Sequence, residues 1–234
     1  MQRSSSDVLL VVPANNTTME PELTALCPVI SGLAVARVSL PPEGVTPDTL
    51  DDYTRTTLAA IEPFAGGRPR LVVYGCTAAG FLAGPEANAR LTGEMQRRTG
   101  APVVATASAM IDVLRHEGVT ETAVVTPYLE PVNDGLRAYL AAEDIAVEVL
   151  GGCECRTTEE LGRVTQDDVL EMALATVTPR SKALFIACSQ LPTMGILDEL
   201  RERLGVPVWS SISATAWASA RRLGEPEEAV SPPG

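Results

Sequence analysis

The sequence of 234 residues has a single histidine, His116, and only 4% aromatic residues. A histidine-rich metal site is therefore impossible, and Ser-His-Asp catalysis would need His116 as its base. His116 stands at the polar end of a predicted helix that Gly118 should cap, where the helix dipole favours a cation. An enzyme with this sequence is thus expected to move protons with another residue type.

Basic residues are also scarce, since Lys and Arg total 18 against 30 Asp and Glu, for a formal charge of -12. No segment supplies the basic stripe that displaces phosphate counterions, so no nucleic-acid partner is expected. No run approaches the roughly 18 apolar residues of a membrane span, and Met1–Asp7 has no apolar signal core. We therefore expect a cytoplasmic protein without a membrane partner, in which the five cysteines are mostly free thiols.

Short apolar runs alternate with longer helical patterns along the chain. This alternation predicts an α/β fold in which parallel sheets are covered by helices on both faces. The predicted strands are Val8–Val12, Leu33–Val38, Arg70–Tyr74, Val103–Thr106, Thr122–Thr126, Ala146–Leu150, Ala183–Ala187 and Pro207–Trp209. The predicted helices lie near Thr49–Glu62, Pro85–Arg98, Ser108–Glu117, Pro131–Glu143, Gln166–Thr178, Thr193–Leu204 and Ser213–Leu223. Ligands of such sheets bind at the carboxyl ends of the strands.

The two halves of the chain resemble one another. Cys76 and Cys188 each follow a strand that ends in a small residue, and each precedes a hydroxyl residue. The two cysteines are 112 residues apart, and Pro13 and Pro127, which end an earlier strand in each half, are 114 apart. Similar offsets in the same order indicate duplication. Two pseudo-symmetric lobes, each a parallel sheet flanked by helices, would bring the cysteine-bearing strand ends to one cleft.

The repeat also predicts how the chain is divided. Residues 1–110 with 212–234 form the first predicted lobe, and residues 111–211 form the second. The segments Met1–Ser6 and Glu225–Gly234 have the polar, proline-containing composition of disordered tails.

Cys76 and Cys188 are the most informative candidates for chemistry. Each is expected to close a buried strand and open a helix, where unpaired N–H groups and the dipole favour a thiolate. The adjacent Thr77 and Ser189 can cap the helix or donate to a ligand. One such cysteine alone would be an ordinary core residue, but two in duplicated positions can supply one thiol to each face of a substrate.

The other three cysteines are weaker candidates. Cys27 follows a helical stretch and is expected to be a packing residue. Cys153 and Cys155 form a C-x-C sequence, which we expect at a loop or strand edge near the cleft. A zinc site would need two further ligands, and the sequence has no C-x-x-C or histidine partner for them.

The loops after the first strand of each half offer neutral donors. In the first half, Asn15-Asn16-Thr17-Thr18 is either an ordinary helix cap or an anion cradle of amides, hydroxyls and backbone N–H groups. The matching loop of the second half offers the phenol of Tyr128. No G-x-G-x-x-G or P-loop lies at a strand end, so a nucleotide cofactor is not expected.

Four segments together resemble the maleate cis-trans isomerases, a branch of the aspartate/glutamate racemase superfamily that also includes arylmalonate decarboxylases and hydantoin racemases. These segments are Asn15–Glu20, Tyr74–Thr77, Thr126–Tyr128 and Ala187–Thr193. The resemblance covers nearly the whole chain. Asn-Thr-Thr-Met-Glu and Cys-x-Gln-Leu-Pro are its most branch-specific motifs, whereas the paired cysteines mark only the superfamily. It implies two α/β lobes, no cofactor, and a substrate enclosed between two thiols.

Carried over to this sequence, the resemblance makes Cys76 the nucleophile and Cys188 its acid/base partner. Asn16 and Tyr128 would hold substrate carboxylates, and the other substrate-binding candidates are Thr77, Ala78, Ser189 and Gln190. One feature departs from the family pattern: an Asp-Asn pair usually stands just before a segment like Leu161–Val164, and this chain has Arg156-Thr157-Thr158-Glu159-Glu160 there.

The resulting hypothesis is a cofactor-independent isomerase of a small unsaturated dicarboxylate, such as maleate, acting through a covalent cysteine adduct. A two-cysteine racemase, a decarboxylase or a non-catalytic small-acid binding protein are the alternatives, and decarboxylases of this family resemble the pattern with only the second cysteine. The expected partner is a small carboxylate; a homo-oligomer is left open. The loops assigned to the cleft, 13–18, 75–80, 126–129 and 187–193, contain no Lys or Arg, so neutral donors should hold the substrate.

Overall fold

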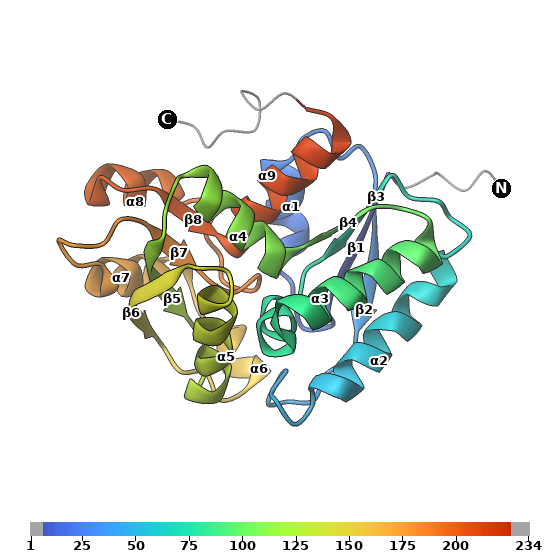
Figure 1. The fold of residues 1–234 in the computed structure, drawn as a ribbon, viewed down its shortest axis with the longest axis horizontal. Helices are drawn as coiled ribbons and strands as arrows, with labels where there is room; N and C mark the ends of the chain where they lie inside the picture. Colours follow the sequence, from blue (N-terminus) through green and yellow to red (C-terminus); the bar gives the residue numbers. More distant parts are fainter. Residues whose placement is uncertain (1–6, 226–234) are drawn as a thin grey trace.

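The computed structural model describes residues 7–225 (Figure 1). The predicted disordered tails, Met1–Ser6 and Glu225–Gly234, lie outside this range except for Glu225. Within the described range, no helix combines the length and the apolar character needed to cross a membrane.

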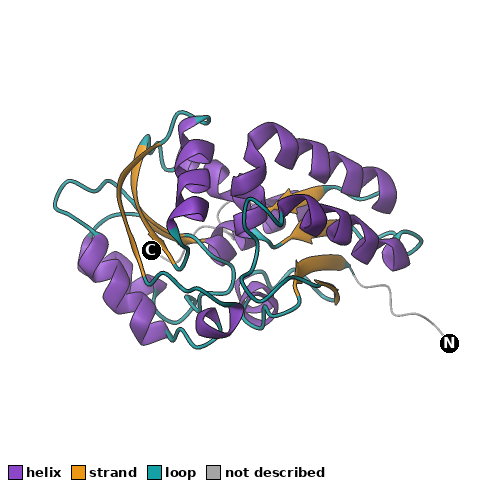
Figure 2. Cartoon of the chain, turned by 90° about the horizontal axis from the view of Figure 1, so that it is seen from below, coloured by secondary structure: helices purple, strands orange, loops and turns teal. Residues whose placement is uncertain are grey.

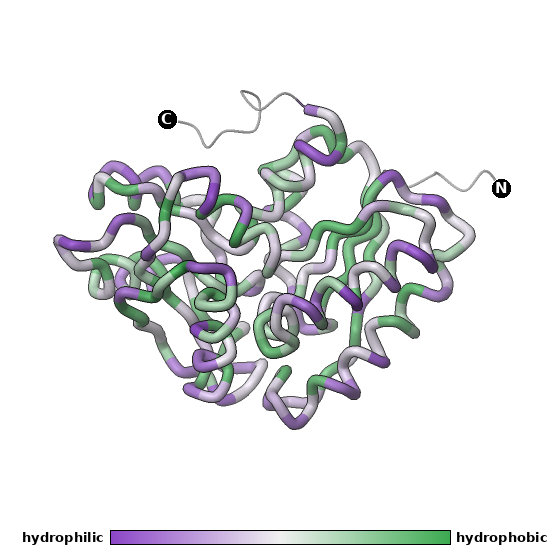
Figure 3. The backbone as a smooth tube through the Cα atoms, viewed as in Figure 1, coloured by the Kyte–Doolittle hydropathy of each residue, from purple (hydrophilic) through white to green (hydrophobic). Residues whose placement is uncertain are grey.

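The first half of the chain forms a parallel sheet because its strands are short and almost entirely apolar. The order is β2-β1-β3-β4, so the two central strands are buried on both faces. The strands are β1 (Val8–Pro13), β2 (Leu33–Val38), β3 (Leu71–Tyr74) and β4 (Val103–Ala105). Figure 3 shows these strands as the most hydrophobic part of this lobe.

The second half repeats this arrangement. Its strands are β5 (Glu121–Thr126), β6 (Ala146–Gly152), β7 (Leu184–Ile186) and β8 (Val208–Ser210), paired in parallel in the order β6-β5-β7-β8. The order matches that of the first sheet. All eight predicted strands are present, with ends that differ by at most two residues. The predicted two-lobe α/β fold is therefore confirmed, and the lobes lie side by side in Figure 1.

Helices cover both sheets (Figure 2). They are α1 (Met19–Leu26), α2 (Leu50–Ile61), α3 (Thr77–Thr99), α4 (Thr106–His116), α5 (Glu130–Ala141), α6 (Thr158–Leu161), α7 (Gln166–Thr176), α8 (Leu197–Leu204) and α9 (Ser211–Leu223), with a 3-10 turn at Glu62–Phe64. The amphipathic α2 buries Tyr53, Thr57 and Ile61, which are four residues apart and so share one face.

Helices α4 and α9 pack against each other beside both sheets. α9 contacts α1 and β3 of the first half as well as β8 of the second. Ile212 of α9 belongs to the core of the first sheet, whereas Trp217 belongs to the core of the second. The division of the chain into lobes at residues 110/111 and 211/212 stays a prediction.

Helix α3 begins earlier than the sequence predicts. We expected it to start at Pro85, but helical structure begins at Thr77 and continues through a kink at Gly84, whose φ of 76° ends the first helical stretch. Pro85 starts the second stretch, which fits its fixed φ and missing N–H. The extra turns place the helix start directly after Cys76.

Candidate active site

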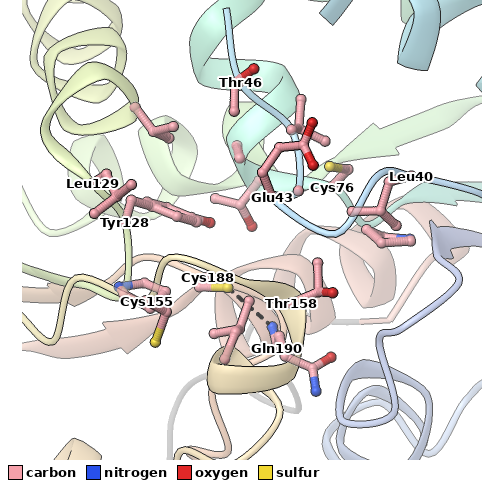
Figure 4. A pocket seen from close by; sticks show the side chains of 18 of the residues that line it. Leu40, Glu43, Thr46, Cys76, Tyr128, Leu129, Cys155, Thr158, Cys188 and Gln190 are labelled. Carbon is pink, nitrogen blue, oxygen red and sulfur yellow. Dashed lines mark hydrogen bonds between the residues drawn. The ribbon is translucent and has the colours of Figure 1, made fainter. Parts of the chain in front are cut away.

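The carboxyl ends of the strands of both sheets border one cavity of about 530 Å3 (Figure 4). The first lobe contributes Asn15 and Asn16 after β1 and Cys76, Thr77 and Ala78 after β3. The second lobe contributes Tyr128 after β5 and Cys188, Ser189 and Gln190 after β7. All eight sequence-predicted site residues line this cavity, so the duplicated pattern did bring the two cysteines into a shared cleft.

Gly75 sets the position of Cys76. A Cβ at Gly75 would lie 2.4 Å from the sulfur of Met19 and 2.7 Å from Val12, so only glycine allows the chain to turn this close to the core. Cys76 then caps α3, which begins at Thr77. The thiol is 4% exposed and faces the cavity.

The local structure around Cys188 differs from the prediction. We expected a helix to open there, but residues 189–196 form turns and α8 begins only at Leu197. Pro192 explains the difference, because proline lacks an N–H donor and keeps the preceding residue, Leu191, out of the helical region. The loop instead aims the backbone N–H of Gln190 at the sulfur of Cys188, 3.4 Å away.

The expected lowering of the cysteine pKa values is wrong. Burial raises the pKa of Cys76 to about 11, and this effect outweighs the lowering of that pKa by the nearby Tyr53 hydroxyl and by the backbone of Ala79. The charge of Cys188 raises it further, so the two thiols resist being ionised together. Burial also raises the pKa of Cys188, against hydrogen bonds from Tyr128 and the following backbone.

Each thiol has one tyrosine beside it. The Tyr128 hydroxyl lies near Cys188 and Thr77, and burial together with the nearby thiolates keeps the pKa of Tyr128 well above its usual value. Tyr128 therefore remains a neutral donor at physiological pH. Tyr53 lies beside Cys76, as Tyr128 lies beside Cys188. Within residues 7–225 the buried Tyr53 hydroxyl makes no conventional hydrogen bond. It interacts with the thiolate form of Cys76 and thereby lowers the pKa of Cys76.

Most of the predicted neutral donors are already bound to protein atoms. Asn16 Nδ2 donates to Ser189 O and Ser189 Oγ, both at 3.0 Å, and Ser189 Oγ donates to Gly75 O at 2.6 Å. The Gln190 side chain accepts from the Thr17 N–H at 3.1 Å. These bonds join the lobes across the floor of the cleft, so Asn16 and Ser189 hold the site together before any substrate binds.

The sequence analysis missed one loop of the cavity wall and noted a second only as a departure from the family pattern. Residues 40 and 43–49 after β2 line the cavity, and so do Thr157, Thr158 and Leu161 after β6. Both loops follow the carboxyl end of an outer strand. The expectation that ligands bind at the carboxyl ends of the strands would therefore also have located these two loops. Thr157 and Thr158 belong to the segment in which the family pattern predicts an Asp-Asn pair, and the Thr158 N–H donates to Pro42 O across the cleft at 2.7 Å.

Among the described residues 7–225, those that line the cavity carry no positive charge. Neither Arg156 nor Arg163 is among them; Arg37 lies behind the wall, where its guanidinium donates to the Asn16 carbonyl at 2.8 Å. Two exposed acids, Glu43 and Asp48, line the cavity instead. A bound carboxylate would meet hydroxyl and N–H donors together with negative charge at the rim.

The other three cysteines and the single histidine lie where the sequence analysis expected them. Cys27 is 1% exposed in the core of the first sheet, which confirms its packing role. Cys153 and Cys155 follow β6, and Cys155 reaches the cavity wall. His116 ends α4, with Gly118 at a φ of 67° just beyond it, and its ring lies 5.2 Å from that of Trp217. All five cysteines are free thiols.

The family model for arylmalonate decarboxylase matches residues 8–232. The chain belongs to this family. It is 29% identical to the arylmalonate decarboxylase of Bordetella bronchiseptica, over 92% of this chain and 86% of that protein. It is 28% identical to the maleate isomerase of Nocardia farcinica, over 93% of this chain and 90% of that protein. The resemblance found in the sequence is thereby confirmed at the level of the family.

Among solved structures, the chain is similar to a cysteine-to-serine mutant of the Nocardia farcinica maleate cis-trans isomerase that carries a covalently bound succinylcysteine intermediate. The TM-score is 0.85 at 25% identity, with 94% of this chain and 93% of that chain covered. In that Nocardia farcinica structure, a cysteine carries a covalently bound succinyl group.

Proposed function

We propose that this protein is a cofactor-independent cis–trans isomerase of a small unsaturated dicarboxylate, maleate or a close analogue. The observation that carries the proposal is the convergence of two thiols, each beside its own tyrosine, in one cavity. The succinylcysteine adduct of the Nocardia relative supports the same chemistry here.

Rotation about a C=C bond requires that the bond become single for a time. We assign this step to Cys76, whose sulfur adds to one alkene carbon and forms an S–C bond, while the alkene electron pair moves onto the neighbouring carbon and its carboxylate. Cys188 accepts the proton that Cys76 loses or returns one to the intermediate. Rotation about the new single bond, followed by loss of the thiolate, gives the trans acid without net oxidation or reduction.

The charge that develops on the carboxylate needs donors placed in advance. The first N–H groups of α3, at Thr77 and Ala78, point out of the helix start beside Cys76, and the Tyr128 hydroxyl lies near Thr77. Such fixed donors stabilise a developing charge more than solvent does. Thr158 is the wall residue we assign to the place of the missing asparagine.

Incubation of the purified protein with maleate, followed by proton NMR, tests the proposal. Formation of fumarate supports an isomerase. A racemase would instead exchange an α-proton with deuterated water, and a binding protein would give only heat of binding.

Decarboxylation is the second candidate, because the matching family model is that of arylmalonate decarboxylase. The presence of Cys76 beside Cys188 argues against it, since a decarboxylase of the kind described needs only the second cysteine. Release of carbon dioxide from a 2-arylmalonate, with no conversion of maleate, would reverse this preference.

A further inference from the structure

Cys153 and Cys155 form a close pair of thiols next to the catalytic cavity. Their sulfur atoms are 3.5 Å apart, and the residue between them, Glu154, has a φ of 48°. Positive φ is unfavourable for a residue with a Cβ atom. The chain thus adopts a strained conformation where it brings two sulfurs into contact.

The pair is fixed to the loop that carries Tyr128. The Cys155 N–H donates to Pro127 O at 2.7 Å, and the Cys153 N–H donates to Thr126 O at 3.3 Å. Gly152 allows this approach, because a Cβ there would lie 1.7 Å from Thr126 O. A movement of the two cysteines is therefore transmitted directly to the backbone next to Tyr128.

The two sulfurs lie between solvent and the active site. Cys153 is exposed, whereas Cys155 is partly buried and lines both the catalytic cavity and an adjoining outer cavity of about 350 Å3. Burial and the contact with Cys153 raise the pKa of Cys155 to about 12, and the charge of Cys188 also acts on it. Cys155 keeps its proton, which leaves Cys153 as the sulfur that a solvent-borne reagent reaches first.

We propose that Cys153 and Cys155 form a reversible disulfide that weakens the catalytic site by displacing the Tyr128 loop. The disulfide itself is independent of the function proposed above, whereas its effect on turnover rests on that function.

The oxidant is a low-molecular-weight disulfide such as glutathione disulfide. The Cys153 thiolate attacks one of its sulfurs, forms a mixed disulfide and releases one glutathione. The Cys155 thiol then loses its proton and attacks the Cys153 sulfur, which releases the second glutathione. Two cysteine thiols are oxidised and one glutathione disulfide is reduced, so electrons and protons balance.

The geometry favours a labile bond over a permanent one. A disulfide needs a sulfur separation of about 2.05 Å, so the 3.5 Å pair must close further across the short C-x-C loop. Strained, exposed disulfides have higher reduction potentials and are the easily reduced, regulatory ones. Closing the ring would pull the Cys155 N–H from Pro127 O and shift the Tyr128 hydroxyl away from Cys188.

Peptide mapping tests the disulfide without any assay of activity. Trypsin releases residues 138–156 as one peptide that holds Cys153 and Cys155 and no other cysteine. After treatment with glutathione disulfide, this peptide should be two hydrogens lighter and resist alkylation, and dithiothreitol should reverse both changes. Cys153→Ser should abolish the change and Cys27→Ser should leave it intact. An unaltered peptide, or a bond between Cys76 and Cys188 instead, would overturn the proposal.

The coupling to the cleft is tested in the same samples. Oxidation should slow the alkylation of Cys188 by iodoacetamide roughly 2- to 10-fold, the effect of weakening one hydrogen bond to the thiolate. It should not do so in Cys153→Ser. An unchanged Cys188 rate in fully oxidised protein would refute the displacement of the Tyr128 loop. Absence of maleate turnover in the reduced protein would refute only the proposed function.

Discussion

The Asn16 side chain donates from Nδ2 to two acceptors of Ser189, the carbonyl oxygen and the hydroxyl oxygen, each at 3.0 Å. The two residues lie in opposite halves of the chain and are both buried. Asn16 Oδ1 meanwhile accepts from the N–H groups of Thr18 and Met19 at the start of α1. This one side chain therefore orders its own loop and the loop that carries Cys188.

Asn16→Ala should lower both stability and turnover. The change leaves the Ser189 carbonyl without its donor, and an unsatisfied buried polar group costs about 1–3 kcal/mol. We expect a lower Tm, measured by thermal unfolding, and a lower kcat for maleate conversion because the loop that carries Cys188 loses its tie to the first lobe. The control is Asn15→Ala, which removes an amide from the same cavity wall but whose Oδ1 has no partner in the described part of the chain. Equal Tm values for the two variants would contradict the joining role of Asn16.

Cys76→Ser should abolish turnover and leave the fold intact. An alcohol is not ionised at neutral pH, and its oxygen is a poorer donor to an alkene carbon than sulfur. Residual activity above about a tenth of wild type would remove Cys76 as nucleophile. The matched variant Cys188→Ser should instead accumulate an adduct of one dicarboxylate on Cys76, detected by intact-protein mass and by peptide mapping.

Tyr53→Phe should make Cys76 harder to ionise. The Tyr53 hydroxyl lowers the pKa of Cys76, so its removal raises that pKa further and moves the rise of alkylation rate to higher pH. Hydrogen bonds to charged groups contribute about 1.5–3 kcal/mol, so the rate at pH 8 should fall roughly 10-fold or more. Tyr74→Phe is the control, because the Tyr74 hydroxyl is also buried but has no part in lowering the pKa of Cys76. Identical pH profiles for Tyr53→Phe and wild type would exclude this role.

The sequence predicts the strands that carry the site and the pairing of its two cysteines. Strands such as Val8–Val12 are so uniformly apolar that only burial on both faces explains them, and parallel sheets bring their carboxyl ends together. Duplication then pairs Cys76 with Cys188 without any knowledge of the coordinates.

Contacts between distant residues could not be predicted. Tyr53 belongs to the apolar face of α2, and its periodicity indicates packing but not that its hydroxyl lies beside Cys76. The pKa of Cys76 was predicted from its place at a helix start, but it is set mainly by burial between the lobes. The helix expected at Cys188 does not form, because Pro192 keeps the residue before it out of the helical region. The prediction followed the similarity of the Cys188 segment to the Cys76 segment and did not take Pro192 into account.

Tyr128→Phe should lower kcat more than it raises KM. The phenol lies beside Cys188 and Thr77 and stays protonated, so it can donate to the charge that develops after thiolate addition. Loss of one hydrogen bond to a charged group gives a roughly 10- to 150-fold decrease. Steady-state kinetics with maleate checks this, and a variant with unchanged kinetics would remove Tyr128 from the reaction.

Glu43→Gln should tighten the binding of a dicarboxylate. Glu43 is exposed and lines the cavity, and within the described part of the chain no Lys or Arg lines this cavity to attract the substrate. Exposed charge pairs are worth about 0.2–1 kcal/mol, so KM should fall roughly 1.5- to 5-fold while kcat changes little, because substrate and transition state feel the same repulsion. The gain should shrink as salt screens it.

Glu202→Gln serves as the matched control for that variant. It removes the same charge from α8, whose residues do not line the cavity, and should leave KM unchanged. An equal decrease in KM for both variants would mean that the net charge of -12, rather than the rim of the cleft, opposes the substrate. A KM for Glu43→Gln that rises would mean that Glu43 positions the substrate instead of repelling it.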